Sequence, residues 1–176
     1  MVFCLDVLNL RGVASARRMP NSNKPTKAKV FLVDDHPLVR EHLTALIQAQ
    51  ADLEVCGEAG DGPTALALIR QQEPDVAIVD ISLKRSSGLE LLRELKGFWP
   101  KLVVLVLSMH DELFYAERAL QAGARGYITK EEATVNILSA IRRVLGGQVY
   151  LSDRMARQMM GRLVSAAKPL AEGVRI

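Results

Sequence analysis

Short apolar runs alternate with stretches of helical periodicity along most of the chain. Each run is four to six residues long, as is typical of buried strands. Between the runs, apolar residues recur at spacings of three and four, which is typical of helices with one buried face. The predicted strands cover residues 30–33, 53–56, 76–79, 102–107 and 126–129, and the predicted helices begin near Pro37, Asp61, Leu89, Asp111 and Glu131.

The boundaries between these segments carry turn and capping signals. Pro37 stands at a first-turn helix position, Gly123 and Gly146 follow helical stretches, and Thr129 forms a capping-box pattern with Glu132. Five strands in strict alternation with helices predict an α/β fold, a doubly wound parallel sheet with helices on both faces. Alternation alone does not set the strand order, and we expect the flavodoxin-like order 2-1-3-4-5. The last of these helices is predicted to bury Val135, Leu138, Ile141 and Leu145.

Polar residues with complementary chemistry follow four of the predicted strands. Asp34 and Asp35 end the first strand, and Asp80 ends the third. Ser108 ends the fourth, and Lys130 follows the fifth. The carboxyl ends of parallel strands share one edge of the sheet, where ligands bind in such folds. We therefore expect three carboxylates, one hydroxyl and one ammonium group to meet in a single cleft.

This set of groups suits a divalent cation and a phosphoryl group. Clustered carboxylates repel one another, and Mg²⁺ relieves that repulsion by binding carboxylate, carbonyl and water oxygens. A carboxylate can also be a nucleophile that forms an aspartyl-phosphate, and an ammonium group can pair with phosphoryl oxygens. The candidate residues are Asp34, Asp35, Asp80 and the carbonyl of Ser82 for the cation, and Asp80, Lys130 and Ser108 for phosphoryl chemistry.

Each of these residues also has an ordinary structural explanation. A single Asp at a strand end is usually a turn former or helix cap, Lys130 could be a solvated surface charge, and Ser108 could cap the next helix. Four matches at strand ends within one alternating pattern favour a functional site. The histidines show no metal-ligand spacing, and there is no glycine-rich phosphate loop.

Charge is unevenly distributed along the chain, which has a net charge of +3. Residues 1–29 carry +5, residues 30–150 carry −5 and residues 151–176 carry +3. The central part is acidic, so its charge gives no reason to expect DNA binding. Two separated cysteines predict no disulfide framework or zinc site and favour a reducing cytoplasm. No apolar stretch approaches the roughly 18 residues of a membrane span.

Two tails flank the predicted domain, which covers residues 28–150. Residues 1–27 are interpreted as a disordered extension or as sequence upstream of an initiator at Met19, in preference to a basic arm for nucleic acid or anionic lipid. Residues 151–176 are expected to form one more helix, capped by Ser152, and a short tail. That helix could be a linker or dimer helix, or a terminal helix docked on its own domain.

Four motifs at the strand ends invite comparison with known families: Val33-Asp34-Asp35-His36-Pro37, Val79-Asp80, Leu107-Ser108-Met109-His110 and Gly123-Ala124-Arg125-Gly126-Tyr127-Ile128-Thr129-Lys130. Together they resemble those of response-regulator receiver domains, in detail the NarL/FixJ subfamily, over residues 28–150. The resemblance implies a role for each matching residue. Asp80 would be the phosphoacceptor, Asp34 and Asp35 the magnesium-binding pair, Ser108 the switch hydroxyl, Tyr127 the switch aromatic residue and Lys130 the phosphate-binding lysine.

The resemblance implies a signalling switch of a two-component system rather than a metabolic enzyme. Such a domain takes phosphate from a phosphohistidine of a sensor histidine kinase and catalyses only its own phosphotransfer and dephosphorylation. Ser108 then turns toward the phosphate and the Tyr127 ring moves inward. The face formed by the helix from Asp111, the strand 126–129 and the helix from Glu131 changes shape.

The resemblance also bears on output. The subfamily usually continues into a helix-turn-helix DNA-binding domain, and no room remains for one here. We therefore expect the receiver part of a transcriptional regulator, which contacts DNA only through an output domain absent from this chain and is compatible with a homodimer. A stand-alone receiver that acts through protein contacts is the alternative. Glu131 stands where many receivers have proline, and Met109 is bulkier than the usual residue beside the switch hydroxyl.

Two other classes fit the sequence less well. A magnesium phosphatase with an aspartyl nucleophile needs a second acid two residues after the nucleophile, where this chain has Ser82. A flavin-binding module needs a phosphate-cradling loop after the first strand, where this chain has two carboxylates.

Overall fold

The computed structural model describes residues 26–84, 87–110 and 113–166. Most of the predicted N-terminal extension, the expected helix start at Asp111 and the tail from residue 167 lie outside these residues. Strands and helices alternate as predicted. The elements are β1 (Ala28–Val33), α1 (Pro37–Gln48), β2 (Leu53–Ala59), α2 (Gly62–Gln72), β3 (Val76–Asp80), α3 (Gly88–Phe98), β4 (Val103–Ser108), α4 (Leu113–Gln121), β5 (Gly126–Thr129), α5 (Lys130–Leu145) and α6 (Asp153–Ala166).

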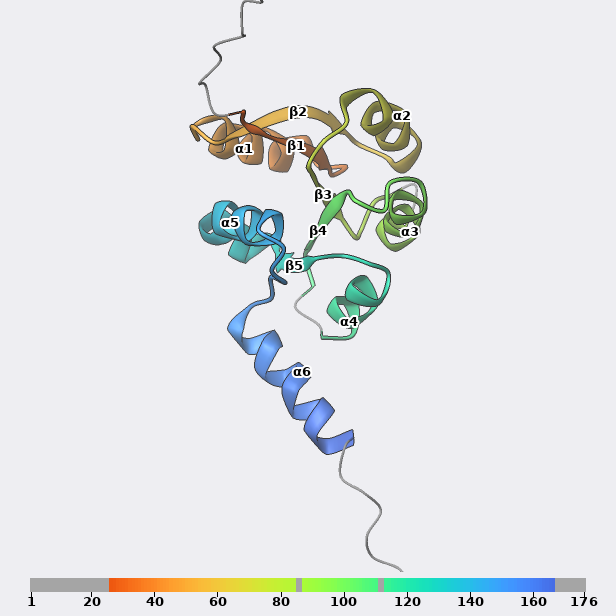
Figure 1. The fold of residues 1–176 in the computed structure, drawn as a ribbon, viewed down its shortest axis with the longest axis vertical. Helices are drawn as coiled ribbons and strands as arrows, with labels where there is room; N and C mark the ends of the chain where they lie inside the picture. Colours follow the sequence, from red (N-terminus) through yellow and green to blue (C-terminus); the bar gives the residue numbers. More distant parts are fainter. Residues whose placement is uncertain (1–25, 85–86, 111–112, 167–176) are drawn as a thin grey trace, which may run out of the picture.

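The strands form one parallel sheet in the order β2-β1-β3-β4-β5, which confirms the expected doubly wound, flavodoxin-like fold. Helices α1 and α5 cover one face of the sheet, and α2, α3 and α4 cover the other (Figure 1). Because all strands run the same way, their carboxyl ends lie along one edge. The residues at the strand ends, which are far apart in the sequence, therefore lie close together in space.

Strand β3 shows why the central runs are apolar throughout. Ala77 and Val79 belong to the core under α2, α3 and α4, while Val76 and Ile78 belong to the core under α1 and α5. A strand covered on both faces has no side toward solvent, so apolar and polar residues do not alternate along it. In β3 only the last residue is polar. That residue is Asp80, which is fully buried.

Helix α5 begins where predicted, and one of its predicted core residues is exposed. The Thr129 side chain accepts from the Glu132 backbone N–H, and Glu132 accepts from the Thr129 N–H, which confirms the capping box. Val135, predicted to be buried, is 83% exposed. Ile141 is buried as predicted, and Leu138 and Leu145 are partly buried against the same core. Val135 alone is on the wrong face, and Ala133 and Ala140 take buried positions that the large apolar residues did not indicate. The buried residues are Ala133, Ile137, Ala140, Ile141 and Val144.

The segment after α5 returns to the sheet edge and then enters α6. The Tyr127 N–H donates to the Tyr150 carbonyl at 2.9 Å, so residue 150 covers the open edge of β5. The Met155 N–H donates to Ser152 Oγ at 3.2 Å, as expected for a cap. Met155 is buried in the core cluster of Tyr127, and Arg162 pairs with Glu117 of α4 at 3.0 Å.

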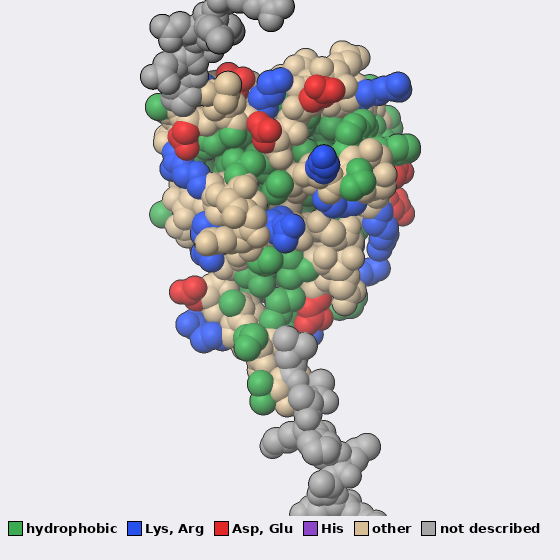
Figure 2. Space-filling view, viewed as in Figure 1, with side chains coloured by type: hydrophobic (Ala, Val, Ile, Leu, Met, Phe, Trp, Pro, Cys, Tyr) green, Lys and Arg blue, Asp and Glu red, His purple; other side chains and the backbone are tan. Residues whose placement is uncertain are grey.

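Helix α6 therefore contacts the domain and does not simply extend away from it, although most of its length projects beyond the sheet (Figure 1). Its opposite side carries the exposed residues Met160 and Val164. Figure 2 shows hydrophobic side chains on the surface in this part of the molecule. The geometry agrees with a docked terminal helix, while a linker role stays a prediction.

Gly88 is expected to be essential for the close approach of α3 to the end of β3. A Cβ added there would overlap the Asp80 carbonyl oxygen and lie 2.6 Å from Ile81 Cα. Both are backbone atoms that cannot rotate away, so Gly88→Ala should lower the free energy of unfolding by about 1–3 kcal/mol, measured by urea titration. Gly97→Ala is the matched control in the same helix, because its added Cβ meets nothing within 4 Å. Equal losses for both variants would contradict this interpretation.

Candidate functional site

The three candidate carboxylates lie together at the carboxyl edge of the sheet. Val33 pairs with Val79 in the β1–β3 register, so Asp34 and Asp80 stand side by side on neighbouring strands. Oxygens of Asp34, Asp35 and Asp80 and a ring nitrogen of His36 all lie within 4.8 Å of one another. The expectation that these carboxylates meet in one place is confirmed.

Lys130, the first residue of α5, is the cation that contacts this cluster. Its Nζ lies 2.7 Å from Oδ2 of Asp80 and 2.7 Å from Oδ2 of Asp34. Its side chain is only 9% exposed. Burial favours the neutral amine, but the interactions with Asp34 and Asp80 outweigh it and hold the pKa of Lys130 above its usual value. Lys130 is thus a fixed positive charge between two carboxylates.

Backbone donors hold the carboxylates in place. The Ser82 N–H donates to Asp80 Oδ1 at 2.9 Å, and the His36 N–H donates to Asp34 Oδ1 at 2.8 Å. The guanidinium of Arg40 donates to the Asp34 carbonyl at 2.6 Å. These contacts leave Oδ2 of Asp34 and Asp80 directed at Lys130. Ser82 contributes its N–H to the site, while cation binding by its carbonyl stays a prediction.

Asp35 lies between the side chains of His36 and Lys84. Its Oδ1 lies 2.9 Å from His36 Nδ1, and its Oδ2 lies 3.2 Å from Lys84 Nζ. Burial favours the neutral form, but the contact with Lys84 and the charges of His36 and Lys84 prevail, so the pKa of Asp35 lies below its usual value. Asp35 is therefore an ionised carboxylate with an 8% exposed side chain.

The residues present fit a divalent cation. Within the described part of the chain, Asp34 Oδ2 and both oxygens of Asp35 are buried and accept no hydrogen bond of good geometry. Asp34 Oδ2 lies against Lys130, and the Asp35 oxygens lie against His36 and Lys84. Burial of carboxylate oxygens without hydrogen bonds lowers the stability of the fold. A hard cation such as Mg²⁺, which prefers oxygen ligands, would offset this cost by binding them.

Ser108 and Tyr127 are linked through one backbone residue. Ser108 is fully buried, and its Oγ accepts from the His110 N–H at 2.9 Å. The Tyr127 hydroxyl donates to the His110 carbonyl at 2.7 Å. The Tyr127 ring is fully buried, and its movement on phosphorylation stays a prediction.

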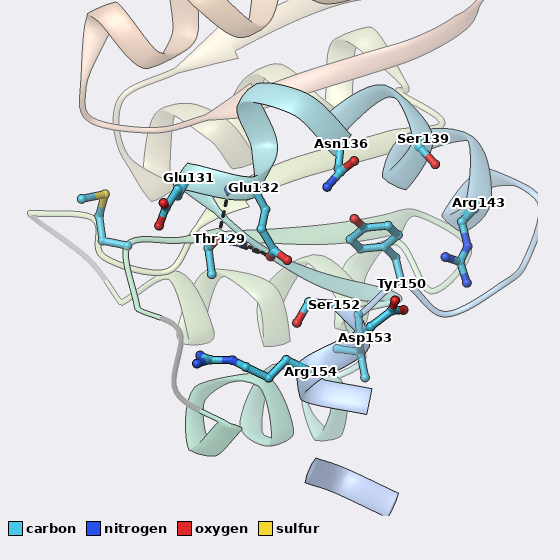
Figure 3. Close-up of a pocket in the computed structure, with 12 residues that line it drawn as sticks. Thr129, Glu131, Glu132, Asn136, Ser139, Arg143, Tyr150, Ser152, Asp153 and Arg154 are labelled. Carbon is cyan, nitrogen blue, oxygen red and sulfur yellow. Dashed lines mark hydrogen bonds between the residues drawn. The ribbon is translucent and has the colours of Figure 1, made fainter. Parts of the chain in front are cut away.

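A groove of about 680 Å³ lies next to the cluster, between α5 and the segment that leads into α6. Figure 3 shows Asn136, Ser139 and Arg143 of α5 on one side and Ser152 and Arg154 on the other. None of the acidic cluster lines it. The groove is therefore separate from the candidate phosphoryl chemistry, although Thr129 beside Lys130 forms part of its wall.

Sequence reasoning missed three residues that contact the cluster. His36 follows the acidic pair directly, which is a signal that could have been used. Arg40 lies one helical turn further on, and Lys84 lies four residues beyond Asp80. Their reach depends on the loop and helix paths, which strand periodicity does not report.

The arrangement supports a limited chemistry. A fully buried carboxylate, Asp80, lies with two further carboxylates and a fixed ammonium, and the buried Ser108 follows Leu107, which pairs with Asp80 between the strands. Three clustered carboxylates suit a metal ion, and the ammonium and hydroxyl suit the oxygens of a transferring phosphoryl group. In the described residues, no helix is long and apolar enough to cross a membrane.

Comparisons with known proteins agree with this geometry. The sequence matches the family described as response regulator receiver domain over residues 30–142. It is 37% identical over 145 residues to the transcriptional regulatory protein MctR of Rhizobium johnstonii, an alignment that covers 82% of this chain and 68% of MctR. The chain spans about two thirds of the length of the curated relatives it matches.

Two solved structures are similar in fold and sequence. A LuxR-family two-component response regulator from Aurantimonas sp. SI85-9A1 has a TM-score of 0.74 and 32% identity, over 79% of this chain and 99% of that structure. The signal receiver domain of the putative response regulator NarL from Mycobacterium tuberculosis has a TM-score of 0.67 and 34% identity, over 70% and 100%.

Proposed function

The chain belongs to the family of response regulator receiver domains, and from that premise we propose that it is a phosphorylation-controlled switch with Asp80 as the phosphoryl acceptor. This is not a family of metabolic enzymes. The chemistry proposed is the domain's own phosphotransfer and dephosphorylation. The expectation of a response-regulator receiver of NarL type is confirmed by the family match and by the similar receiver structures, one of them named as a NarL receiver domain.

The observation that carries the proposal is the environment of Asp80. Its side chain is fully buried at the end of the central strand, with Oδ1 held by the Ser82 N–H and Oδ2 by Lys130. A carboxylate fixed in this way loses little conformational freedom when it attacks phosphorus. An Asp80 oxygen would form the new P–O bond while the P–N bond of the donor phosphohistidine breaks, and the departing imidazole takes up a proton.

Lys130 would stabilise the charge that moves in this transfer. In the free site its Nζ neutralises Asp34 and Asp80 together. When Asp80 carries the phosphoryl group, the same ammonium can contact a phosphoryl oxygen without leaving its place at the start of α5. Preorganised charge of this kind lowers the barrier because it needs no reorganisation during the reaction.

Asp34, Asp35 and Asp80, with the Ser82 carbonyl, would hold Mg²⁺. The bound ion would neutralise charge on the phosphoryl oxygens as a Lewis acid. Asp35 is the residue best placed for this role, because both of its oxygens are buried and accept no hydrogen bond of good geometry from the described residues. Asp34 already contacts Lys130 and is expected to assist through water.

The output proposed is a change in the face formed by α4, β5 and α5. Ser108 would turn to a phosphoryl oxygen and release the His110 N–H that it now accepts from. His110 also accepts from Tyr127 and stacks on Tyr115 of α4. A movement of His110 would therefore reach both β5 and α4, and through the shared core cluster it would reach Met155 of α6.

The partner proposed is a sensor histidine kinase, the donor that this family implies. MctR is named a transcriptional regulatory protein, so we infer that this receiver controls transcription through a DNA-binding domain outside the present sequence. A stand-alone receiver that acts by protein contacts is the second candidate, and a homodimer is compatible with both. The position of α6 supports a role in transmitting the change, because Met155 near its start belongs to the core cluster of Tyr127 and Arg162 further along pairs with Glu117 of α4.

Removal of the Ser108 hydroxyl should uncouple the switch from phosphorylation. A ligand shifts a two-state equilibrium only by its differential affinity for the two states, and this hydroxyl is the group that contacts the phosphoryl oxygens in one state alone. Amide NMR shifts with and without beryllofluoride, a phosphoryl mimic, should change at Tyr127 and in α4 of the parent and change much less in Ser108→Ala. Labelling by acetyl phosphate should fall less than this response.

Ser139→Ala is the matched control, because it removes an exposed hydroxyl from α5. It should respond like the parent. A parent without shifts at Tyr127 or in α4 would not be a working receiver switch. A Ser108→Ala response as large as the parent's would exclude the hydroxyl as the coupling element.

A further inference from the structure

Asp35 is contacted by a lysine that comes from outside the strand-end cluster. Lys84 lies in the loop after β3, and its Nζ is 3.2 Å from Asp35 Oδ2. The Lys84 side chain is 72% exposed, whereas that of Asp35 is 8% exposed. A solvated cation thus reaches onto a buried carboxylate that is a candidate metal ligand.

The two lysines of the site contact different carboxylates. Lys130, which is 9% exposed, contacts Asp34 and Asp80 and lies at the start of a helix. Lys84 contacts Asp35 alone among the pairs that the described residues show. Lys130 cannot leave without exposing two buried charges, but the ammonium of Lys84 can swing into water at little cost.

We propose that Lys84 competes with the divalent cation for Asp35 and so sets the Mg²⁺ concentration at which this receiver becomes able to accept phosphate. The proposal rests on the function proposed above. An ion bound to Asp35 Oδ2 and an ammonium group near the same oxygen would repel each other, so binding of one requires the other to move away. The exposed position of Lys84 makes this a graded competition rather than a block.

His36 contributes to the same balance from the other side. Its Nδ1 lies 2.9 Å from Asp35 Oδ1 and 3.1 Å from Asp34 Oδ1. Unlike Lys84, its ring contacts Asp34 as well as Asp35, so replacement of His36 would disturb two candidate ligands at once. Among the ion pairs of the described residues Lys84 contacts Asp35 alone, and for that reason it is the residue that can be changed cleanly.

The test is a Mg²⁺ titration of the full chain, followed by amide NMR shifts of the strand-end residues. Lys84→Gln should lower the Mg²⁺ dissociation constant about two- to five-fold, the equivalent of an ion pair with one exposed partner. The Mg²⁺ concentration for half-maximal labelling by acetyl phosphate should fall by the same factor. Lys84→Arg, which keeps the charge, should stay close to the parent.

Lys101→Gln is the matched control. It removes the same charge from an exposed lysine just before β4, at the opposite edge of the sheet. Equal Mg²⁺ affinities for Lys84→Gln and Lys101→Gln, or a weaker affinity for Lys84→Gln, would overturn the role of Lys84 and leave the metal site intact. A parent without Mg²⁺-dependent shifts at Asp34, Asp35 and Asp80 would overturn the metal site and the competition together.

Discussion

Replacement of Asp35 with alanine should abolish magnesium-dependent phosphoryl labelling of this protein. Asp35 supplies two buried oxygens, one beside His36 Nδ1 and the other beside Lys84 Nζ. Without this carboxylate, Mg²⁺ would lose a principal ligand, and the rate of labelling by acetyl phosphate should fall on the order of 100-fold or more, since a bound metal contributes several kcal/mol to charge stabilisation.

The loss should not come from unfolding. Asp35→Ala removes one negative charge from a cluster of carboxylates and lets Lys84 return to water, so the urea midpoint should stay near that of the parent. Glu94→Ala, which removes an exposed carboxylate from α3, should label as the parent does. Labelling of Asp35→Ala at the parent rate, or labelling that needs no metal, would show that the cation site is wrong.

Lys130→Met should damage both chemistry and stability. Asp34 and Asp80 are 2% and 0% exposed, and removal of Lys130 leaves both without their shared cation. Loss of one partner from a buried ion pair costs about 3–5 kcal/mol. Loss of a preorganised charge at a transferring group typically slows reaction about 10²- to 10³-fold. We expect effects of these sizes on the free energy of unfolding in urea and on the labelling rate.

Two further variants separate the causes. In the double variant Lys130→Met with Asp80→Asn, part of the lost stability should return, because one uncompensated buried charge is gone. Lys130→Arg keeps the charge and should retain more stability than Lys130→Met. If Lys130→Met is as stable as the parent and labels equally fast, the lysine is neither the counter-ion nor the phosphate-binding group.

The site could be predicted because it lies at strand ends. In a parallel sheet the carboxyl ends share one edge, so the positions of Asp34, Asp80 and Ser108 in the sequence fix their proximity in space. The register confirms this, with Val33 beside Val79 and Leu107 beside Asp80. The central strands are covered by helices on both faces, so their residues are nearly all apolar. For that reason the hydrophobic runs identified these strands in the sequence.

The remaining features depend on contacts that periodicity does not encode. Val135 was assigned to the wrong face of α5 because two of the buried positions are alanines, Ala133 and Ala140, which carry little hydrophobic signal. The reach of Lys84 to Asp35 follows from the path of the loop after β3. The docking of α6 follows from the burial of Met155 in the core cluster that includes residues of α4 and β5. The short apolar stripe of α6 did not show whether this helix packs on its own domain.

Mapping the phosphorylated residue tests the central claim most directly. The protein is treated with acetyl phosphate and Mg²⁺, and the acyl phosphate is located by mass spectrometry after reduction to the corresponding alcohol. We expect a single labelled position, Asp80, and no labelling in Asp80→Asn. A label on another residue, or undiminished labelling of Asp80→Asn, would contradict the assignment of this buried carboxylate as the phosphoryl acceptor.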